Sequence, residues 1–482
     1  MSNDKKNSLD LARRATAVWD YVFQDSRSIR DTFTHIIEKP SLLGAWSTLQ
    51  DLQSEYPYIR LELFESLRQR LEDIITHLSC DQTLTPTTRQ LMMLQVYQLL
   101  CFVTYTEPSS GQTIRIPILF PGDQESPSTF RIVTYTFNTI ELCGRKDDPY
   151  CAYELVAKPP DNDAPRLLLF PGTAPLPWQR GAYLTYASDI SPYRAVGSTI
   201  YQASREKLNK LLSSDHSTIA IGHSLGGAMC GMLAKDHPNT AFRAFLAPLS
   251  ISYSNVIYAA LLHLSCIAII AAGLYFGFPI LPVFGLALAT LLIAPLAYSL
   301  FTYIYRNISA KLSTKDTAAK KISQDGLSQH LLVTQQNDIV SNVGDTLYTP
   351  TCSGIHLTHK GTNQDFIRAH TQAFTHLDST TMHRYDAEQQ TLSFRRILFN
   401  AYWEMVLKPC TTLLFHLYFT ISYSLSPKKT EEFKTQTLSQ KRLRPEGIAY
   451  PHQSKNRPRS YSGPTTHITQ ENKNNDTPSS RR

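Results

Sequence analysis

The stretch Ile219–Gly227, which reads IAIGHSLGG, decides the fold of this sequence. Its first residues belong to a short apolar run typical of a buried strand, and an apolar helical pattern follows it as far as Lys235. Between the two, Gly222-x-Ser224-x-Gly226 predicts a tight strand-to-helix turn, because the glycines remove side chains that would clash around a strained serine. The helix N-terminus that follows favours negative charge developing beside the Ser224 hydroxyl.

Strands and helices alternate on both sides of this turn. We expect strands at Arg166–Phe170, Ser217–Ile221, Phe242–Leu246, His330–Thr334 and Gly354–Thr358, and helices at Arg194–Leu212 and Leu225–Lys235. Strands that alternate with helices form mostly parallel sheets that are covered on both faces. The sequence therefore predicts an α/β fold, within a domain that we place at residues 106–400.

The residues that precede the strand–helix alternation have different patterns. Residues 1–105 are expected to form a helical N-terminal region, since apolar residues such as Phe64, Leu67 and Leu71 recur at helical spacing. From about residue 113 to 156 the apolar period changes to two, which indicates strands. The first 14 residues are polar and charged, and we expect no cleavable secretory signal.

A long uncharged segment interrupts the alternation. Residues 244–305, 62 in a row, contain no Asp, Glu, Lys or Arg. Inside lie two apolar blocks, Val256–Phe276 and Leu281–Ile304, and each has the length of about 20 residues that a bilayer-spanning helix requires. We predict a membrane hairpin at 256–304, the alternative being a buried pair of soluble helices. Basic residues flank it on both sides, so both ends are expected to face the cytosol.

The C-terminal part divides into an apolar segment and a basic tail. Residues 401–426 contain a possible third membrane helix, and an interfacial helix or a core helix would fit the same pattern. Residues 427–482 hold 12 Lys+Arg against 5 Asp+Glu, which accounts for the whole net charge of +7. Their composition predicts a disordered basic tail, suited to the anionic cytosolic face of a membrane. The rest of the chain is neutral, so composition gives no reason to expect nucleic-acid binding.

Overall composition excludes several classes of protein. The chain has 482 residues, of which 42% are hydrophobic and 18% charged, which excludes a wholly disordered or collagen-like protein. The eight cysteines are scattered without the spacing of a zinc site, so no metal site is predicted. The mean hydropathy of -0.23 conceals the uncharged segment.

The GHSLGG sequence resembles the nucleophile turn of the class 3 (triacylglycerol) lipases, which have the α/β-hydrolase fold. Two further segments resemble motifs of that family in the same order. Leu169–Thr173 (LFPGT) is similar to its oxyanion motif, with Pro171 where the family has Arg, and Val333–Val340 (VTQQNDIV) is similar to its acid-bearing N-D-I-V segment. The resemblance covers about residues 165–375 without the hairpin, and it implies a Ser-His-Asp esterase that needs no cofactor.

Site residues follow from the resemblance and from the expected fold. Ser224 is the candidate nucleophile, and the backbone N–H groups of Leu225 and Thr173 are candidate oxyanion donors, with the Thr173 hydroxyl as a further possibility. Asp338 follows a predicted strand and is the candidate acid of the triad, and Asp345 is the alternative.

The identity of the base stays open at this point. His359 would end the last predicted strand, where this fold normally delivers its base, whereas Ala369-His370 resembles the final A-H of the family. We favour His359, with His370 as the alternative and with His356 and His376 as weaker candidates. His223, next to the nucleophile, is expected to point away from the site and to serve in packing.

These observations lead to a functional expectation. The chain is expected to be a membrane-associated serine hydrolase acting on lipid esters, with its catalytic domain facing the cytosol. Its expected partners are the membrane bilayer and a lipid ester substrate. A lipid acyltransferase that uses the same acyl-enzyme, or a non-catalytic membrane scaffold, is the alternative. The double apolar segment also resembles the bilobed hairpin of inclusion-membrane proteins of intracellular bacteria, which would imply an exported effector.

Overall fold

A computed structural model of the chain describes residues 57–413 with gaps, the longest being 121–128, 313–326, 360–369, 371–379 and 386–392. Contacts divide the chain into two units, Met1–Leu417 and Tyr418–Arg482, and all described residues belong to the first. The basic tail lies outside the described residues, as do residues 414–426 of the segment 401–426, whereas residues 401–413 are helical.

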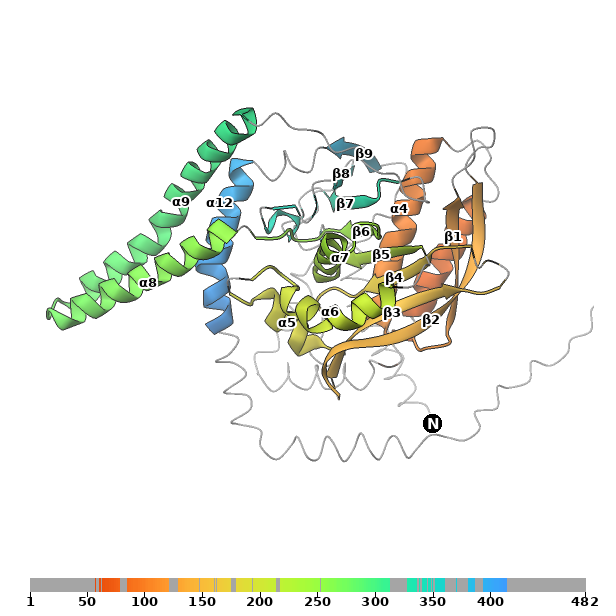
Figure 1. The fold of residues 1–482 in the computed structure, drawn as a ribbon, viewed down its shortest axis with the longest axis horizontal. Coiled ribbons are helices and arrows are strands. Elements are labelled where there is room, and N and C mark those ends of the chain that lie inside the picture. Colours follow the sequence, from red (N-terminus) through yellow and green to blue (C-terminus); the bar gives the residue numbers. More distant parts are fainter. Residues whose placement is uncertain are drawn as a thin grey trace, which may run out of the picture. The chain divides into compact units, whose positions relative to one another are not determined.

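The described strands form one mixed sheet, in which their order follows the chain (Figure 1). They are β1 (Thr113–Phe120), β2 (Thr129–Arg145), β3 (Asp148–Ala157), β4 (Arg166–Phe170), β5 (Thr218–His223), β6 (Ala241–Phe245), β7 (His330–Gln335), β8 (Ser353–His359) and β9 (Thr380–Tyr385). Strands β4 to β8 are parallel, whereas β1 to β4 and the β8–β9 pair are antiparallel. The prediction of a mostly parallel sheet is therefore right for the centre and wrong for the edges, where antiparallel neighbours need no crossover helix.

The main helices are α4 (Pro86–Val103), α5 (Ala182–Asp189), α6 (Ser198–Leu212), α7 (Leu225–Asp236), α8 (Tyr253–Tyr275), α9 (Ile280–Leu312) and α12 (Phe394–Tyr402), with the short turns η1 (Thr104–Thr106), η2 (Val340–Asn342) and the π-helical η4 (Trp403–Leu407). Helices α6, α7 and α8 match the predicted bounds to within a few residues, whereas α9 continues past Ile304 to Leu312.

Helices cover both faces of the sheet, as the sequence predicts. In β4, Leu167 and Leu169 belong to one core and Leu168 and Phe170 to the other, because successive side chains of a strand point to opposite faces. The first core includes α4 and helical residues 63–78, and the second includes α6 and α7. The described helices of the N-terminal region thus form a layer on the sheet that carries Ser224.

Helices α8 and α9 form a pair whose apolar side chains are largely exposed. Mean hydropathy reaches 2.2 within Asn255–Tyr275 and 2.3 within Ile280–Ser309, and 17% of each most apolar window is buried. By length and composition both could cross a membrane, whereas the core helix of a soluble protein would be mostly buried. The pair packs on α12 and η4, with the Tyr402 hydroxyl donating to the Leu292 carbonyl (2.6 Å) and the His263 ring 2.8 Å from the Met405 carbonyl oxygen.

Candidate active site

Ser224 lies between β5 and α7 in a backbone conformation that few residues other than glycine adopt. Its φ is 54° and its ψ is -123°. Among the described residues, Glu107 and Leu246 are the other non-glycine residues with positive φ. Such a conformation costs about 1–3 kcal/mol and persists only where the surroundings impose it. Here the Ser224 N–H donates to the Phe245 carbonyl (2.9 Å) and the Ser224 carbonyl accepts from the Ala228 N–H (3.1 Å), so the strained serine that the sequence predicts is present.

The glycines of this turn leave no room for side chains. A Cβ on Gly222 would lie 2.2 Å from the Gly226 oxygen, and one on Gly226 would lie 2.1 Å from the Phe170 oxygen. A Cβ on Gly227 would lie 2.6 Å from the Ala247 Cβ. The start of α7 therefore packs directly against the end of β4 and against the strand next to β5. We call residues 222–227 the elbow.

Asp338 lies just after β7, and three donors surround its fully buried side chain. Its Oδ1 accepts from the Val340 N–H (3.0 Å) and its Oδ2 from the Ser341 N–H (3.1 Å). The third donor is the His370 ring, whose Nδ1 lies 2.9 Å from Oδ1. Hydrogen bonds of this kind stabilise the charged carboxylate. An ionised carboxylate only accepts, so His370 carries its proton on Nδ1 and leaves the Nε2 lone pair available.

The structure joins Asp338 to His370, the alternative base of the sequence analysis. His359 is the last residue of β8 and pairs with Thr380 of β9, and its side chain lies outside the described residues. His370 instead comes from the segment that connects β8 and β9.

Of the weaker candidates, the structure describes His356. The His356 ring lies 3.0 Å from the Thr334 hydroxyl, and burial lowers the pKa of His356. Asp345 and His376 lie outside the described residues.

Residues 171–174, which we call the oxyanion loop, lie beside the elbow. A Cβ on Gly172 would be 2.8 Å from the His223 carbonyl oxygen, so the two segments touch. The Thr173 hydroxyl donates its proton to Asp189 Oδ2 (2.5 Å). Because this hydrogen bond uses the hydroxyl, the Thr173 backbone N–H is the candidate oxyanion donor. Leu225 is the first residue of α7, where backbone N–H groups have no acceptor within the helix.

Asp189 is a half-buried acid that no sequence motif marks. It ends α5, and burial raises the pKa of its carboxyl to about 7, against the opposing effect of the Thr173 hydrogen bond and of Lys408. Its Oδ1 has no hydrogen-bond partner among the described residues. It holds the Thr173 side chain and thereby the conformation of the oxyanion loop.

His223 is buried but makes specific contacts, which a packing residue does not require. Its Nε2 lies 2.7 Å from the His370 carbonyl oxygen, and the two rings are 4.8 Å apart. Its Nδ1 lies 3.2 Å from the Tyr105 hydroxyl, and the Phe102 ring is 5.4 Å away. The contact with His370 brings that histidine next to the residue before Ser224. Only the position of His223 beside the serine marked it in the sequence, and nothing there pointed to Tyr105.

No protein-family model, curated protein or solved structure matches this chain. No group of three or more metal-binding side chains occurs in the part of the chain that the structure describes. What the site can do is judged from its own geometry: a strained serine, a histidine whose backbone contacts the residue before that serine, and a buried carboxylate on the same histidine.

Proposed function

We propose that this protein is a membrane-associated serine hydrolase that cleaves carboxylic esters of lipids. The observation that carries the proposal is the strained Ser224, whose chain neighbour His223 contacts the His370 carbonyl, together with the buried Asp338 that holds Nδ1 of the same His370. The nucleophile, the orienting carboxylate and the base follow one another along the chain as Ser, Asp and His, which is the order found in the α/β-hydrolases. The reaction needs no metal or organic cofactor.

In the first half of the reaction Ser224 Oγ attacks the acyl carbonyl carbon while its proton passes to His370 Nε2. The resulting oxyanion accepts hydrogen bonds from the backbone N–H groups of Leu225 and Thr173. The intermediate then collapses, the ester C–O bond breaks, and the alcohol leaves with the proton from His370. Asp338 keeps the imidazole in the required tautomer and stabilises its charged form.

In the second half, water replaces the alcohol. It gives its proton to His370 as its oxygen attacks the acyl-enzyme, the bond to Ser224 Oγ breaks, and the serine regains the proton. A carboxylic acid is released. If a lipid hydroxyl attacked in place of water, the same steps would make a new ester, and product analysis with and without a sterol or glycerol acceptor separates the two outcomes.

The hairpin of α8 and α9 supports a lipid substrate. It separates β6 from β7, and β7 is the strand that Asp338 follows. Its exposed side chains include Tyr275 (85%) and Leu281 (84%) next to the connecting turn. We place this apolar surface in the bilayer, with both ends in the cytosol. An acyl chain that reaches the site from the membrane avoids a hydration cost of about 0.8 kcal/mol per CH₂.

A fluorophosphonate probe on the full-length protein in detergent tests the proposal. We expect covalent labelling of the wild type and of Ser213→Ala, which changes an exposed serine, and none of Ser224→Ala. Absence of labelling in the folded wild type would overturn the hydrolase. With p-nitrophenyl esters from acetyl to palmitoyl, a preference for the shortest chain would overturn the lipid substrate.

A further inference from the structure

The hydrogen bonds of His223 fix its protonation. Nε2 lies 2.7 Å from a backbone carbonyl, which only accepts, so Nε2 carries the proton. Nδ1 must then accept, and the Tyr105 hydroxyl 3.2 Å away is its donor. Both ring nitrogens of a histidine next to the nucleophile are therefore engaged, one by the backbone of His370 and the other by the N-terminal layer.

We propose that Tyr105 and His223 are positioning residues for the base His370, which makes the N-terminal layer part of the active site. The hydrogen bonds form a chain from the Tyr105 O–H to His223 Nδ1, and from the His223 Nε2–H to the His370 carbonyl. Asp338 holds the His370 ring, and His223 holds its backbone. This inference rests on the proposed function, because it assigns the two residues a role in that reaction.

The protonation states suit this role. Burial lowers the pKa of His223 to about 3, so the ring stays neutral with one donor and one acceptor nitrogen at neutral pH. Burial also raises the pKa of Tyr105, so its hydroxyl keeps the proton that it donates. A chain of two neutral groups keeps the same hydrogen bonds while His370 gains and loses a proton.

Tyr105 is itself held against the oxyanion loop. Its hydroxyl fills the space beside Gly172, where a Cβ would lie 2.1 Å from the Tyr105 oxygen. Its backbone carbonyl accepts a hydrogen bond from the Gln179 side chain (3.3 Å). Tyr105 lies in the turn η1, whose first residue, Thr104, donates its hydroxyl to the Cys101 carbonyl at the end of α4 (2.6 Å). The same tyrosine thus touches the loop that carries Thr173 and the histidine beside Ser224.

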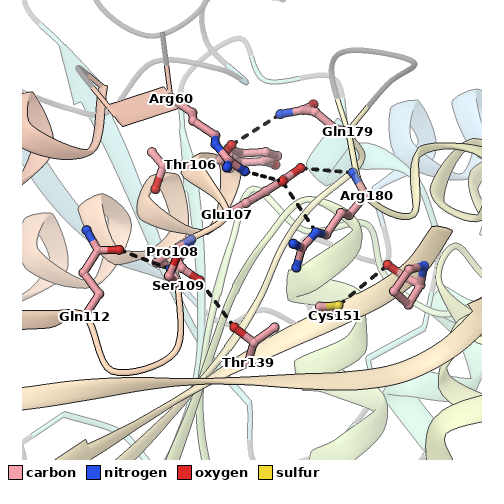
Figure 2. A network of polar contacts seen from close by, with 12 residues as sticks. Arg60, Thr106, Glu107, Pro108, Ser109, Gln112, Thr139, Cys151, Gln179 and Arg180 are labelled. Carbon is pink, nitrogen blue, oxygen red and sulfur yellow. Dashed lines mark hydrogen bonds and ion pairs between the residues drawn. The ribbon is translucent and has the colours of Figure 1, made fainter. Parts of the chain in front are cut away.

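An ion-pair cluster fixes the end of this turn (Figure 2). Glu107, which follows η1, adopts a left-handed conformation with φ 50°. Its carboxylate accepts from Arg60 Nη1 (2.9 Å) and from the Arg180 backbone N–H (3.0 Å), and its side chain is 10% exposed. The cluster joins the helical N-terminal residues, η1 and the segment that follows the oxyanion loop.

The test compares Tyr105→Phe and His223→Leu with matched controls that remove buried hydrogen bonds away from the site. Tyr135→Phe loses a bond to the Pro165 carbonyl, and His330→Leu loses one to Thr349. His223→Gln serves as the rescue variant, because its amide retains an N–H donor. The full-length protein in detergent is assayed for kcat and KM with a p-nitrophenyl ester, for the rate of fluorophosphonate labelling, and for Tm.

We expect Tyr105→Phe to lower kcat by about tenfold and His223→Leu by about 100-fold, the loss that a displaced catalytic group typically causes, with KM unchanged. His223→Gln should recover part of the loss, and each variant should keep the Tm of its control. Equal kcat in each variant and its control, or a loss explained by KM or Tm, would overturn the inference alone. Failure of the wild type to label would overturn the proposed function with it.

Discussion

A methyl group added to Gly226 in the elbow would lie 2.1 Å from a carbonyl oxygen, whereas one added to Gly285 in α9 would meet no atom within 4 Å. The backbone of the elbow packs so closely on its neighbours that no side chain fits at Gly222, Gly226 or Gly227. The hairpin leaves large side chains such as Ile293 (64%) uncovered. The elbow is therefore held by packing within the protein, whereas α8 and α9 expose apolar side chains and by length and composition could cross a membrane.

Helix α12 contacts both the segment that follows Asp338 and the hairpin. Arg396 donates to the carbonyls of Ser341 and Gly344, and the Asn400 side chain donates to the Gly344 carbonyl (2.7 Å), in the segment that follows Asp338. One turn later, Tyr402 bonds to Leu292 in α9. One short helix thus contacts both the segment that follows Asp338 and the hairpin. Substitutions can change the site and the hairpin one at a time.

The largest effect is expected from Asp338→Asn. The asparagine NH₂ would donate to His370 Nδ1, and the proton would move to Nε2, where it blocks transfer from Ser224. We expect kcat to fall by about 10⁴-fold with little change in KM. Steady-state kinetics check this, with Asp163→Asn, which removes an exposed partner of Arg131, as the control. Equal activities of the two variants would contradict the assigned acid.

The next effect contrasts the two glycines. Gly226→Ala should lower the free energy of unfolding by about 3 kcal/mol or more, since the methyl group can be placed only by moving β4 or α7. Gly285→Ala should be neutral or stabilising by up to about 1 kcal/mol, because alanine favours a helix. Denaturant unfolding in detergent measures both. Equal free energies of unfolding for Gly226→Ala and Gly285→Ala would contradict the close packing of Gly226 on the Phe170 carbonyl.

A charge in the hairpin should weaken membrane association. Ile293→Lys places a charge in the middle of α9, at a cost of about 3 kcal/mol if that helix lies in a bilayer. Ile132→Lys, which changes a partly exposed residue of β2, should have no such effect. Flotation of the full-length variants with phospholipid vesicles measures the difference. Unchanged binding of Ile293→Lys would argue against a hairpin in the membrane.

The smallest effect concerns pH. The folded-state pKa of Asp189, about 7, lies above its unfolded value near 4, so the folded state binds the extra proton between these values. Its contribution to stability therefore decreases as pH rises from about 4 to 7 and then levels off. Asp189→Asn removes this dependence, so its stability relative to the wild type should increase across that window. A pH-independent difference in unfolding free energy would contradict the raised pKa.

The sequence predicts the parts of this site that depend on short-range pattern. Ser224 and Asp338 directly follow apolar strands, and the steric demand for glycine around the serine is visible in GHSLGG. The candidate base was less predictable, because several histidines follow Asp338 and the contact that joins His370 to Asp338 spans 32 residues of the chain. Tyr105 could not be predicted, since it lies 118 residues before His223 in the chain and reaches it only through the packing of α4 on the sheet.

The most direct test of the central claim is to map fluorophosphonate labelling in His370→Ala and in His359→Ala. An imidazole that activates Ser224 must be the one held by Asp338, so we expect His359→Ala to label at Ser224 at the wild-type rate. His370→Ala should label at least about 100-fold more slowly, the lower end of what a base contributes. Fast labelling of His370→Ala, or loss of labelling in a folded His359→Ala, would contradict the assignment.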